Sequence, residues 1–179
     1  FAARRNQAAT IASLSDREMA DLLFMREEEK LARDVYLAMY QIWRLPVFSS
    51  IASSEQMHMD AMLSMVKIYG LSDPVASNGI GKFTDPRLQA LHDELVTRGK
   101  TSALEALRVG GYIEEVDMLD IQHAMEATDA SNLDQVYANL LSGSRSHLQA
   151  FASQIKSRTG QSYVAQVLTQ DEVLRIIGY

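Results

Sequence analysis

Four stretches of this 179-residue sequence place acidic or histidine side chains on stripes where a helix would ordinarily bury apolar ones. In the second stretch the two polar residues are three positions apart, so they share one helix face a single turn apart. Interruptions of one stripe arise often by chance, whereas four stretches with the same kind of interruption point to one shared site. The interrupting residues are Glu29 in the first stretch, Glu55 and His58 in the second, Glu114 and Asp117 in the third, and His147 in the fourth.

Acidic and histidine side chains gathered in the interior of one helical domain predict a metal site. Burying several carboxylates without partners costs several kcal/mol per ion, so something cationic must offset them. The chain has no cysteine, which excludes thiolate ligands, iron-sulfur clusters and disulfides. Carboxylate oxygen together with imidazole nitrogen suits iron, manganese or zinc. Bridging glutamates from different helices are how a bundle holds two ions close together, so two metal ions are expected.

Three of these acidic positions have an alternative. Glu28 lies on a competing stripe, and the charged run around it is typical of a solvated face, so stripe position favours Glu29 as the inward residue. Glu115 competes with Glu114 in the same way, and stripe position again favours Glu114. Asp117 is either a metal ligand or an acceptor that orients a ligand histidine.

The remaining histidines and two arginines have other expected roles. His147 is either a ligand or a hydrogen-bonded histidine of the core. His92 and His123 have no carboxylate in register, so we expect them at the surface or behind the ligands. Arg33 and Arg145 are expected to form ion pairs with the acidic cluster.

The elements that position these residues are predicted to be helices throughout. The three prolines and nine glycines cluster and leave long stretches of helical periodicity, which indicates an all-α fold. A Ser15 to Glu18 capping pattern starts a helix that ends before Pro46, and Ser49 or Ser50 is the expected cap of the next, which Gly70 stops. An ordered connection over 71–86 then leads to helices over about 87–98, 101–127 and 133–158. The segment 160–179 has no clear pattern.

The predicted connectivity is that of a ferritin-like four-helix bundle, in which a long connection with its own short helix joins two antiparallel helix pairs. The run from Arg26 to Tyr36, followed by Glu55-x-x-His58, Glu114 and His147, resembles the ferritin-like di-iron superfamily that includes the rubrerythrins. The same run, together with the segment 143–148 (Gly-Ser-Arg-Ser-His-Leu), more closely resembles an uncharacterised bacterial and archaeal family of ferritin-like domains, DUF2202.

The resemblance covers about 14–158 and implies a ferritin-like bundle over these residues, with 159–179 as a C-terminal tail packed on it. It further implies a di-iron centre, with manganese or zinc as alternatives, and redox chemistry such as Fe(II) oxidation by oxygen or peroxide, or peroxide reduction. Ser144 departs from the superfamily pattern, which has its last bridging Glu there. Asp117 could replace that carboxylate, water could fill its place, or one metal position could be weak. The alternative function is a non-catalytic bundle for metal storage or partner binding.

Charge and hydropathy limit the binding partners and the cellular locations that we expect. The chain carries 17 Lys and Arg against 23 Asp and Glu, a net charge of -6, which disfavours nucleic acid and anionic membranes and favours cations. No apolar run approaches the roughly 18 residues that span a bilayer, so a soluble protein is expected, either cytoplasmic or exported. The sequence begins at Phe1, which is compatible with a removed signal or a trimmed end. A homodimer is compatible with these features.

Overall fold

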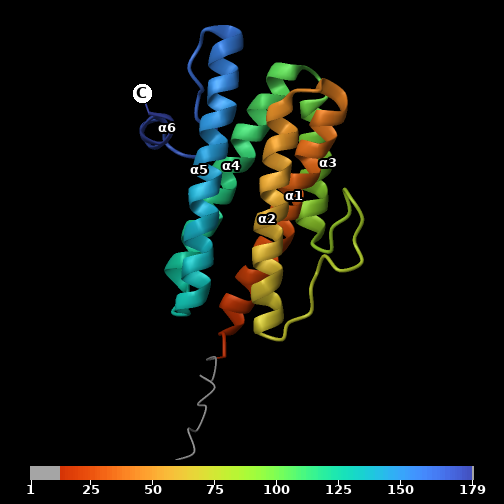
Figure 1. The fold of residues 1–179 in the computed structure, drawn as a ribbon, viewed down its shortest axis with the longest axis vertical. Helices are drawn as coiled ribbons and strands as arrows, with labels where there is room; N and C mark the ends of the chain where they lie inside the picture. The colour runs from red at the N-terminus through yellow and green to blue at the C-terminus, as the bar shows by residue number, and fades with distance from the viewer. Residues whose placement is uncertain (1–12, 179) are drawn as a thin grey trace, which may run out of the picture.

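Residues 13–178 are described by a computed structural model, and in this range the fold is all helical, as predicted. The predicted helix boundaries lie within a few residues of the observed ones, and the segment without a clear pattern contains a short sixth helix. The start of the chain, where a removed signal was considered, lies outside the described residues. The helices, shown in Figure 1, are α1 (Asp16–Trp43), α2 (Pro46–Ile68), α3 (Pro86–Gly99), α4 (Ala103–Ala127), α5 (Ser131–Thr159) and α6 (Gln170–Ile177).

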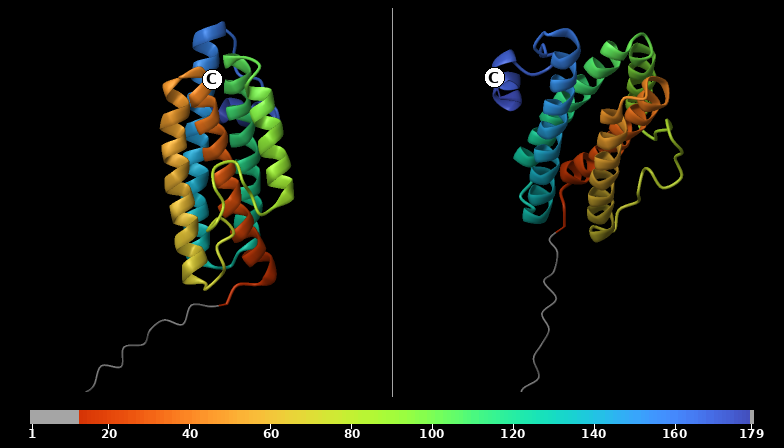
Figure 2. Two further views of the ribbon diagram at one scale, coloured as in Figure 1. Left: turned by 90° about the vertical axis from the view of Figure 1, so that its right-hand side faces the viewer. Right: turned by 45° about the horizontal axis from the view of Figure 1, so that its top comes forward.

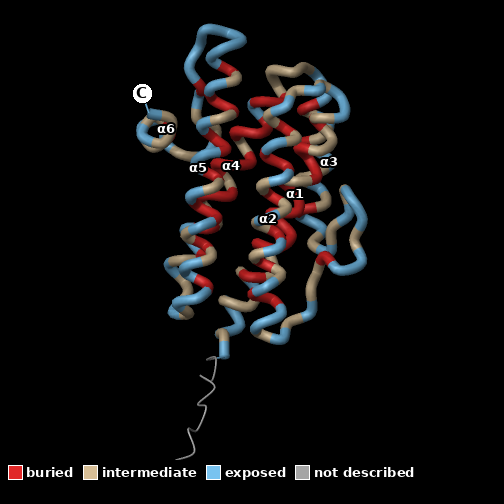
Figure 3. Tube along the Cα trace, in the orientation of Figure 1, coloured by how far each residue is buried: buried red, intermediate tan, exposed pale blue. Residues whose placement is uncertain are grey.

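The long helices form a bundle of two antiparallel pairs. Helix α1 packs against α2 and α4 against α5, and the pairs meet through contacts of α1 with α4 and of α2 with α5 (Figures 1 and 2). The buried residues lie on the faces that these helices turn toward one another, as Figure 3 shows. Tyr36, Phe48 and Phe151 fill one level of this core, with the rings of Tyr36 and Phe151 centred 5.3 Å apart.

The two predicted helix starts near the N-terminus have different outcomes. Ser15 forms the predicted capping box: its hydroxyl accepts from the Glu18 N–H (3.3 Å), and the Glu18 carboxylate accepts from the Ser15 N–H (2.8 Å). The predicted caps of α2 are wrong, because this helix already begins at Pro46. Proline needs no N–H bond at a first helical position and its φ is already helical, so no side-chain cap is required. Ser49 instead donates its hydroxyl to the Pro46 carbonyl (3.0 Å).

The connection over 69–85 crosses α1 and is held there by buried charged groups of that helix (Figure 2). The prediction that the charged run is a solvated face is therefore wrong. Glu27 is buried and accepts from the backbone N–H groups of Thr84 (2.5 Å) and Asp85 (3.0 Å). Lys30, which has no exposed surface, donates to the Gly79 carbonyl (2.8 Å). These bonds satisfy both the loop backbone and the buried charges.

The residues after α5 lie against α4 through one buried carboxylate. Glu115 accepts hydrogen bonds from the hydroxyl of Tyr163 (2.6 Å) and from the backbone N–H groups of Gln166, Val167 and Leu168. Helix α6 then packs against α5. None of the helices in residues 13–178 combines the length and apolar character needed to cross a bilayer.

Candidate metal centre

Five of the six predicted site residues form two groups in the middle of the bundle. Glu29, Glu55 and His58 make the first group, and Glu55, Glu114 and His147 make the second. Within each group the ligand atoms lie within 4.8 Å of one another. Every long helix contributes, since α1, α2, α4 and α5 each supply at least one of these side chains. Glu55 belongs to both groups and so joins them.

Each histidine of the centre directs Nδ1 at two carboxylates. His58 Nδ1 lies 3.1 Å from Glu29 Oε2 and 2.8 Å from Glu55 Oε2. His147 Nδ1 lies 2.8 Å from Glu55 Oε1 and 3.4 Å from Glu114 Oε2. The two oxygens of Glu55 therefore serve different histidines, which is the arrangement of a carboxylate placed to bridge two ions.

These separations fit the edges of a metal coordination shell. Two ligand atoms that are each about 2.1 Å from an ion, at right angles to one another, stand about 3.0 Å apart. The four nitrogen to oxygen distances, 2.8 to 3.4 Å, lie around this value. A single Nδ1 proton can be shared well with only one of two carboxylates, whereas a cation can contact both. Glu29 Oε1 and His147 Nδ1 are buried, and no hydrogen-bond partner of acceptable geometry lies within residues 13–178.

The two imidazole rings are oriented by neighbours that do not belong to the centre. His147 Nε2 lies 2.8 Å from the Ser54 hydroxyl, so the ring can donate there and leave Nδ1 free as a ligand. The His58 ring lies directly against Gly143 of α5, where an added Cβ would fall 2.5 Å from Nε2. Glycine at this position therefore makes room for the ring.

Burial and mutual contact shift the titration of the centre. Burial raises the pKa of Glu29 to about 8 and that of Glu114 to about 7. Burial would also raise the pKa of Glu55, but contacts with His147 and His58 outweigh it and hold the value at about 2. Burial opposes the charge on the histidines, yet the facing carboxylates raise the pKa of His58 to about 11 and of His147 to about 10. Protons on the two rings thus supply positive charge that metal ions would replace.

Asp117, the sixth predicted residue, lies beside both groups and belongs to neither. Its Oδ2 accepts a hydrogen bond from the Ser144 hydroxyl (2.5 Å), and its Oδ1 is buried with no hydrogen-bond partner in the part of the chain that the structure describes. Burial raises the pKa of Asp117, and the nearby charges of Glu29 and Glu28 raise it further. A carboxylate from α4 therefore stands next to the serine at which the superfamily pattern has its last glutamate.

Other predicted residues lie apart from the centre. Arg33 was expected to pair with the acidic cluster, but it pairs instead with Asp34 (2.7 Å) and donates to Gln56. His123 is exposed on α4, as expected. Tyr36 is buried in the core and donates its hydroxyl to Glu114 Oε1 (2.5 Å).

Ser54 and Gly143 were not predicted from the sequence as residues of the centre. Ser54 precedes Glu55 as an ordinary polar residue of α2, and Gly143 interrupts no stripe. Their contribution depends on how α2 and α5 approach one another, which only the packed bundle shows. The predicted alternative Glu28 is as buried as Glu29, and Glu115 is as buried as Glu114, so burial does not separate the pairs; their contacts do.

Comparison with known proteins identifies the family. Residues 18–178 match the family described as an uncharacterized protein domain, DUF2202. The chain is 42% identical over 164 residues to the uncharacterized protein MJ0754 of Methanocaldococcus jannaschii, which covers 92% of this chain and 88% of that protein. The crystal structure of hypothetical protein MJ0754 from Methanococcus jannaschii DSM 2661 has a TM-score of 0.90 and 40% identity, and the match covers 94% of this chain and 95% of that one. The chain therefore belongs to the DUF2202 family.

Proposed function

We propose that this protein is a ferritin-like metal-binding protein whose centre holds two metal ions, with iron as the physiological metal and redox turnover as its activity. The observation that carries the proposal is the sharing of Glu55 between two three-ligand groups. One group contains His58 and the other His147, so each ion would have one nitrogen ligand, one carboxylate of its own and one oxygen of the shared carboxylate. Carboxylate and imidazole ligands suit iron, manganese and zinc.

The helix order supports the ferritin-like assignment. The sequence pattern indicates a long connection between the second and third long helices, and α3 lies within that connection. The proposed domain extends over 14–158, with 159–179 as a tail packed on it. The MJ0754 structure superposes over nearly the whole chain, so the same helix arrangement is expected in other members of the family.

The residues of the centre have distinct proposed roles. Glu29 and Glu114 would each bind one ion, and Glu55 would bridge the two. Bound iron would supply electrons for reduction of oxygen or peroxide, as the superfamily resemblance implies. Tyr36 holds Glu114 in place through its hydroxyl, and Ser54 fixes the His147 ring. The surrounding apolar core keeps bulk water away, which strengthens the attraction between the carboxylates and a cation.

A non-catalytic role in metal storage or partner binding is the alternative, and Ser144 is the observation that favours it. The superfamily pattern has a second bridging glutamate there, whereas this chain offers only a hydroxyl bonded to Asp117. Fewer bridging carboxylates would leave the ions less strongly coupled. The two functions differ in turnover and not in metal binding.

Anaerobic loading of the metal-free protein with Fe(II), followed by exposure to oxygen, tests the proposal. We expect two iron ions per chain and oxygen consumption faster than in a buffer control, with the Glu55→Gln variant close to the buffer rate. Bound iron without oxygen or peroxide consumption would support the storage role. A protein that binds no iron would overturn both functions.

A further inference from the structure

Several buried carboxylate oxygens outside the two metal groups have no hydrogen-bond partner among the described residues. They are Asp21 Oδ2, Glu28 Oε2 and Asp117 Oδ1. Glu28 and Asp117 are 4% and 5% exposed, so bulk water cannot solvate their charge. An unpaired buried carboxylate is costly, and its persistence in a well-packed bundle calls for an explanation.

Two of these carboxylates, Glu28 and Asp117, form a series with Asp120 between the surface and the centre. Asp117 lies one helical turn from Glu114 on one side and one turn from Asp120 on the other, because the three are spaced by three residues along α4. Glu28 of α1 directly precedes the candidate ligand Glu29 and interacts with the carboxyl of Asp120. Since α1 and α4 pack side by side, Glu28 also lies near Asp117, whose pKa its charge raises.

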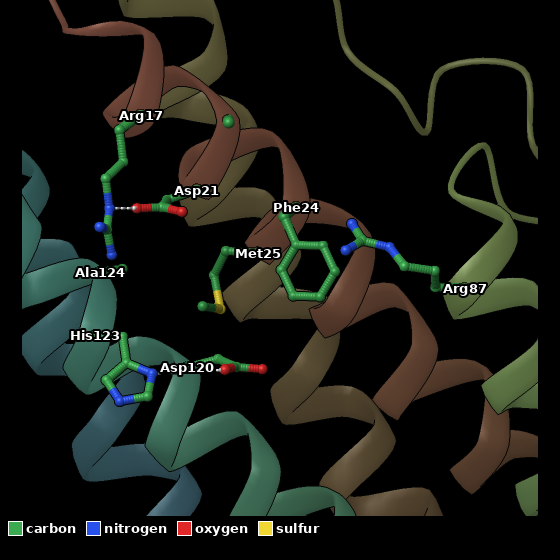
Figure 4. A pocket seen from close by; sticks show the side chains of 9 residues that line it. Arg17, Asp21, Phe24, Met25, Arg87, Asp120, His123 and Ala124 are labelled. Carbon is green, nitrogen blue, oxygen red and sulfur yellow. Dashed lines mark ion pairs between the residues drawn. The ribbon is translucent and has the colours of Figure 1, made fainter.

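The outer end of this series opens into a cavity of about 450 Å³ between α1, α3 and α4 (Figure 4). Asp21 and Met25 line it from α1, and Asp120 and His123 line it from α4. Asp120 thus lines the cavity, and its carboxyl lies near enough to the buried Glu28 to raise the pKa of Glu28.

Four basic residues flank Glu28 in sequence or line the cavity, and each of them pairs with an aspartate. On α1, Arg26 binds Asp73 (3.1 Å) and Lys30 binds Asp34, so neither neutralises Glu28. At the cavity itself, the largely exposed Arg17 lies 3.5 Å from Asp21, the pair that is dashed in Figure 4, and Arg87 pairs with Asp85 (2.6 Å) outside the cavity lining. Within residues 13–178 neither Arg26 nor Lys30 pairs with Glu28 or Asp117, so a divalent cation that reaches these two side chains meets carboxylate oxygens without a positive partner.

The spacing argues against a third tight site. Only two groups of three ligand atoms within 4.8 Å occur in residues 13–178, and neither includes Glu28 or Asp120. Carboxylates that follow one another in space, without meeting around one point, can each bind a cation only weakly. Such positions allow a hydrated divalent cation to exchange its waters for carboxylate oxygens one step at a time, without being trapped.

We propose that the cavity between α1, α3 and α4 is the entrance for divalent cations, and that Asp120, Glu28 and Asp117 conduct them to the centre. This inference rests on the proposed metal-binding function, since a route requires a destination. It adds the direction of entry, from the α1 and α4 side of the bundle, and assigns a role to three carboxylates that belong to neither ligand group of the centre.

Stopped-flow mixing of the metal-free full chain with Co(II), followed through the visible absorption of bound cobalt, tests the route. Electrostatic focusing of this kind changes association rates by about 10- to 1,000-fold. We expect Asp120→Asn and Glu28→Gln to slow loading about tenfold or more, while equilibrium dialysis still gives two cobalt ions per chain. Asp120 is partly exposed, so this variant should fold normally. Glu126→Gln removes the same charge from an exposed position of α4 that does not line the cavity, and should load at the wild-type rate.

The outcomes separate the route from the centre. Wild-type loading rates in both Asp120→Asn and Glu28→Gln would overturn the route and leave the centre intact. A reduced cobalt stoichiometry in these variants would also overturn it, because the residues would then be ligands. If the wild-type chain binds no cobalt at equilibrium, the proposed function fails, and the route fails with it.

Discussion

Replacing Glu55 by glutamine should weaken both metal positions at once. Its two oxygens lie 2.8 Å from His58 Nδ1 and 2.8 Å from His147 Nδ1, so one neutral amide would replace the anionic ligand of both ions. A contact to a charged group is worth about 1.5–3 kcal/mol, which corresponds to a loss of roughly 10- to 150-fold in affinity at each position. Glutamine has nearly the same volume, so the core should remain packed.

The effect can be measured as stabilisation by added metal. At a free metal concentration 100 times Kd, one site stabilises the folded state by about 2.7 kcal/mol, and a 100-fold weaker site by about 0.4 kcal/mol. For a chain of this size the corresponding increases in Tm are roughly 5–11 °C and 1–2 °C. Thermal unfolding monitored by circular dichroism, with and without Mn(II), gives both values. Glu29→Gln and Glu114→Gln are the matched controls, because each belongs to one group and should weaken one ion only. An unchanged metal-induced shift in Glu55→Gln would refute the bridging role.

Three further predictions concern the neighbours of the centre, the C-terminal segment and pH. Gly143→Ala should lower the metal-free Tm and weaken metal binding about tenfold, because the new Cβ would lie 2.5 Å from His58 Nε2 and push the ring away from Glu29 and Glu55; equal affinities by titration calorimetry would contradict this. Glu115→Ala should destabilise the fold by about 2–4 kcal/mol, because it leaves the buried donors of Tyr163, Val167 and Leu168 unpaired. Residues 160–169 should then become accessible to limited proteolysis, while the metal stoichiometry stays unchanged. A variant whose 160–169 segment resists the protease would speak against this role. The metal-free protein should lose stability as pH rises from 6.5 to 9. The folded-state pKa values of His58 and His147 are raised from 6.5 to about 11 and about 10, so the folded state holds protons that the unfolded state releases. Bound metal should flatten this decline, and identical pH profiles with and without metal would be inconsistent with ligation through Nδ1.

The ligand residues could be predicted from sequence because a bundle interior is apolar by default. A charged residue on a helix stripe is conspicuous there, and Glu55 and His58 stand one turn apart on the same face. Helix ends were also predictable where side chains signal them, as at Ser15. The start at Pro46 was missed because proline favours a helix start through its backbone geometry and needs no polar side chain.

The buried charges outside the centre could not be predicted in the same way. Glu27 and Lys30 lie in a run of charged residues that resembles a solvated face, yet they bind backbone groups of the connection between α2 and α3. Their partners are about fifty residues away in sequence, and nothing in the local pattern indicates which loop will cover the helix. Glu115 is the same case, with its donors in the segment after α5. Long-range backbone bonds of this kind depend on tertiary structure and leave no periodic signal.

The two iron positions can be located by anomalous diffraction from crystals grown anaerobically with Fe(II), recorded on either side of the iron absorption edge. We expect two iron peaks, one among Glu29, Glu55 and His58 and the other among Glu55, Glu114 and His147. An ordered Glu55 carboxylate with no anomalous peak on either side of it would refute the proposed metal centre.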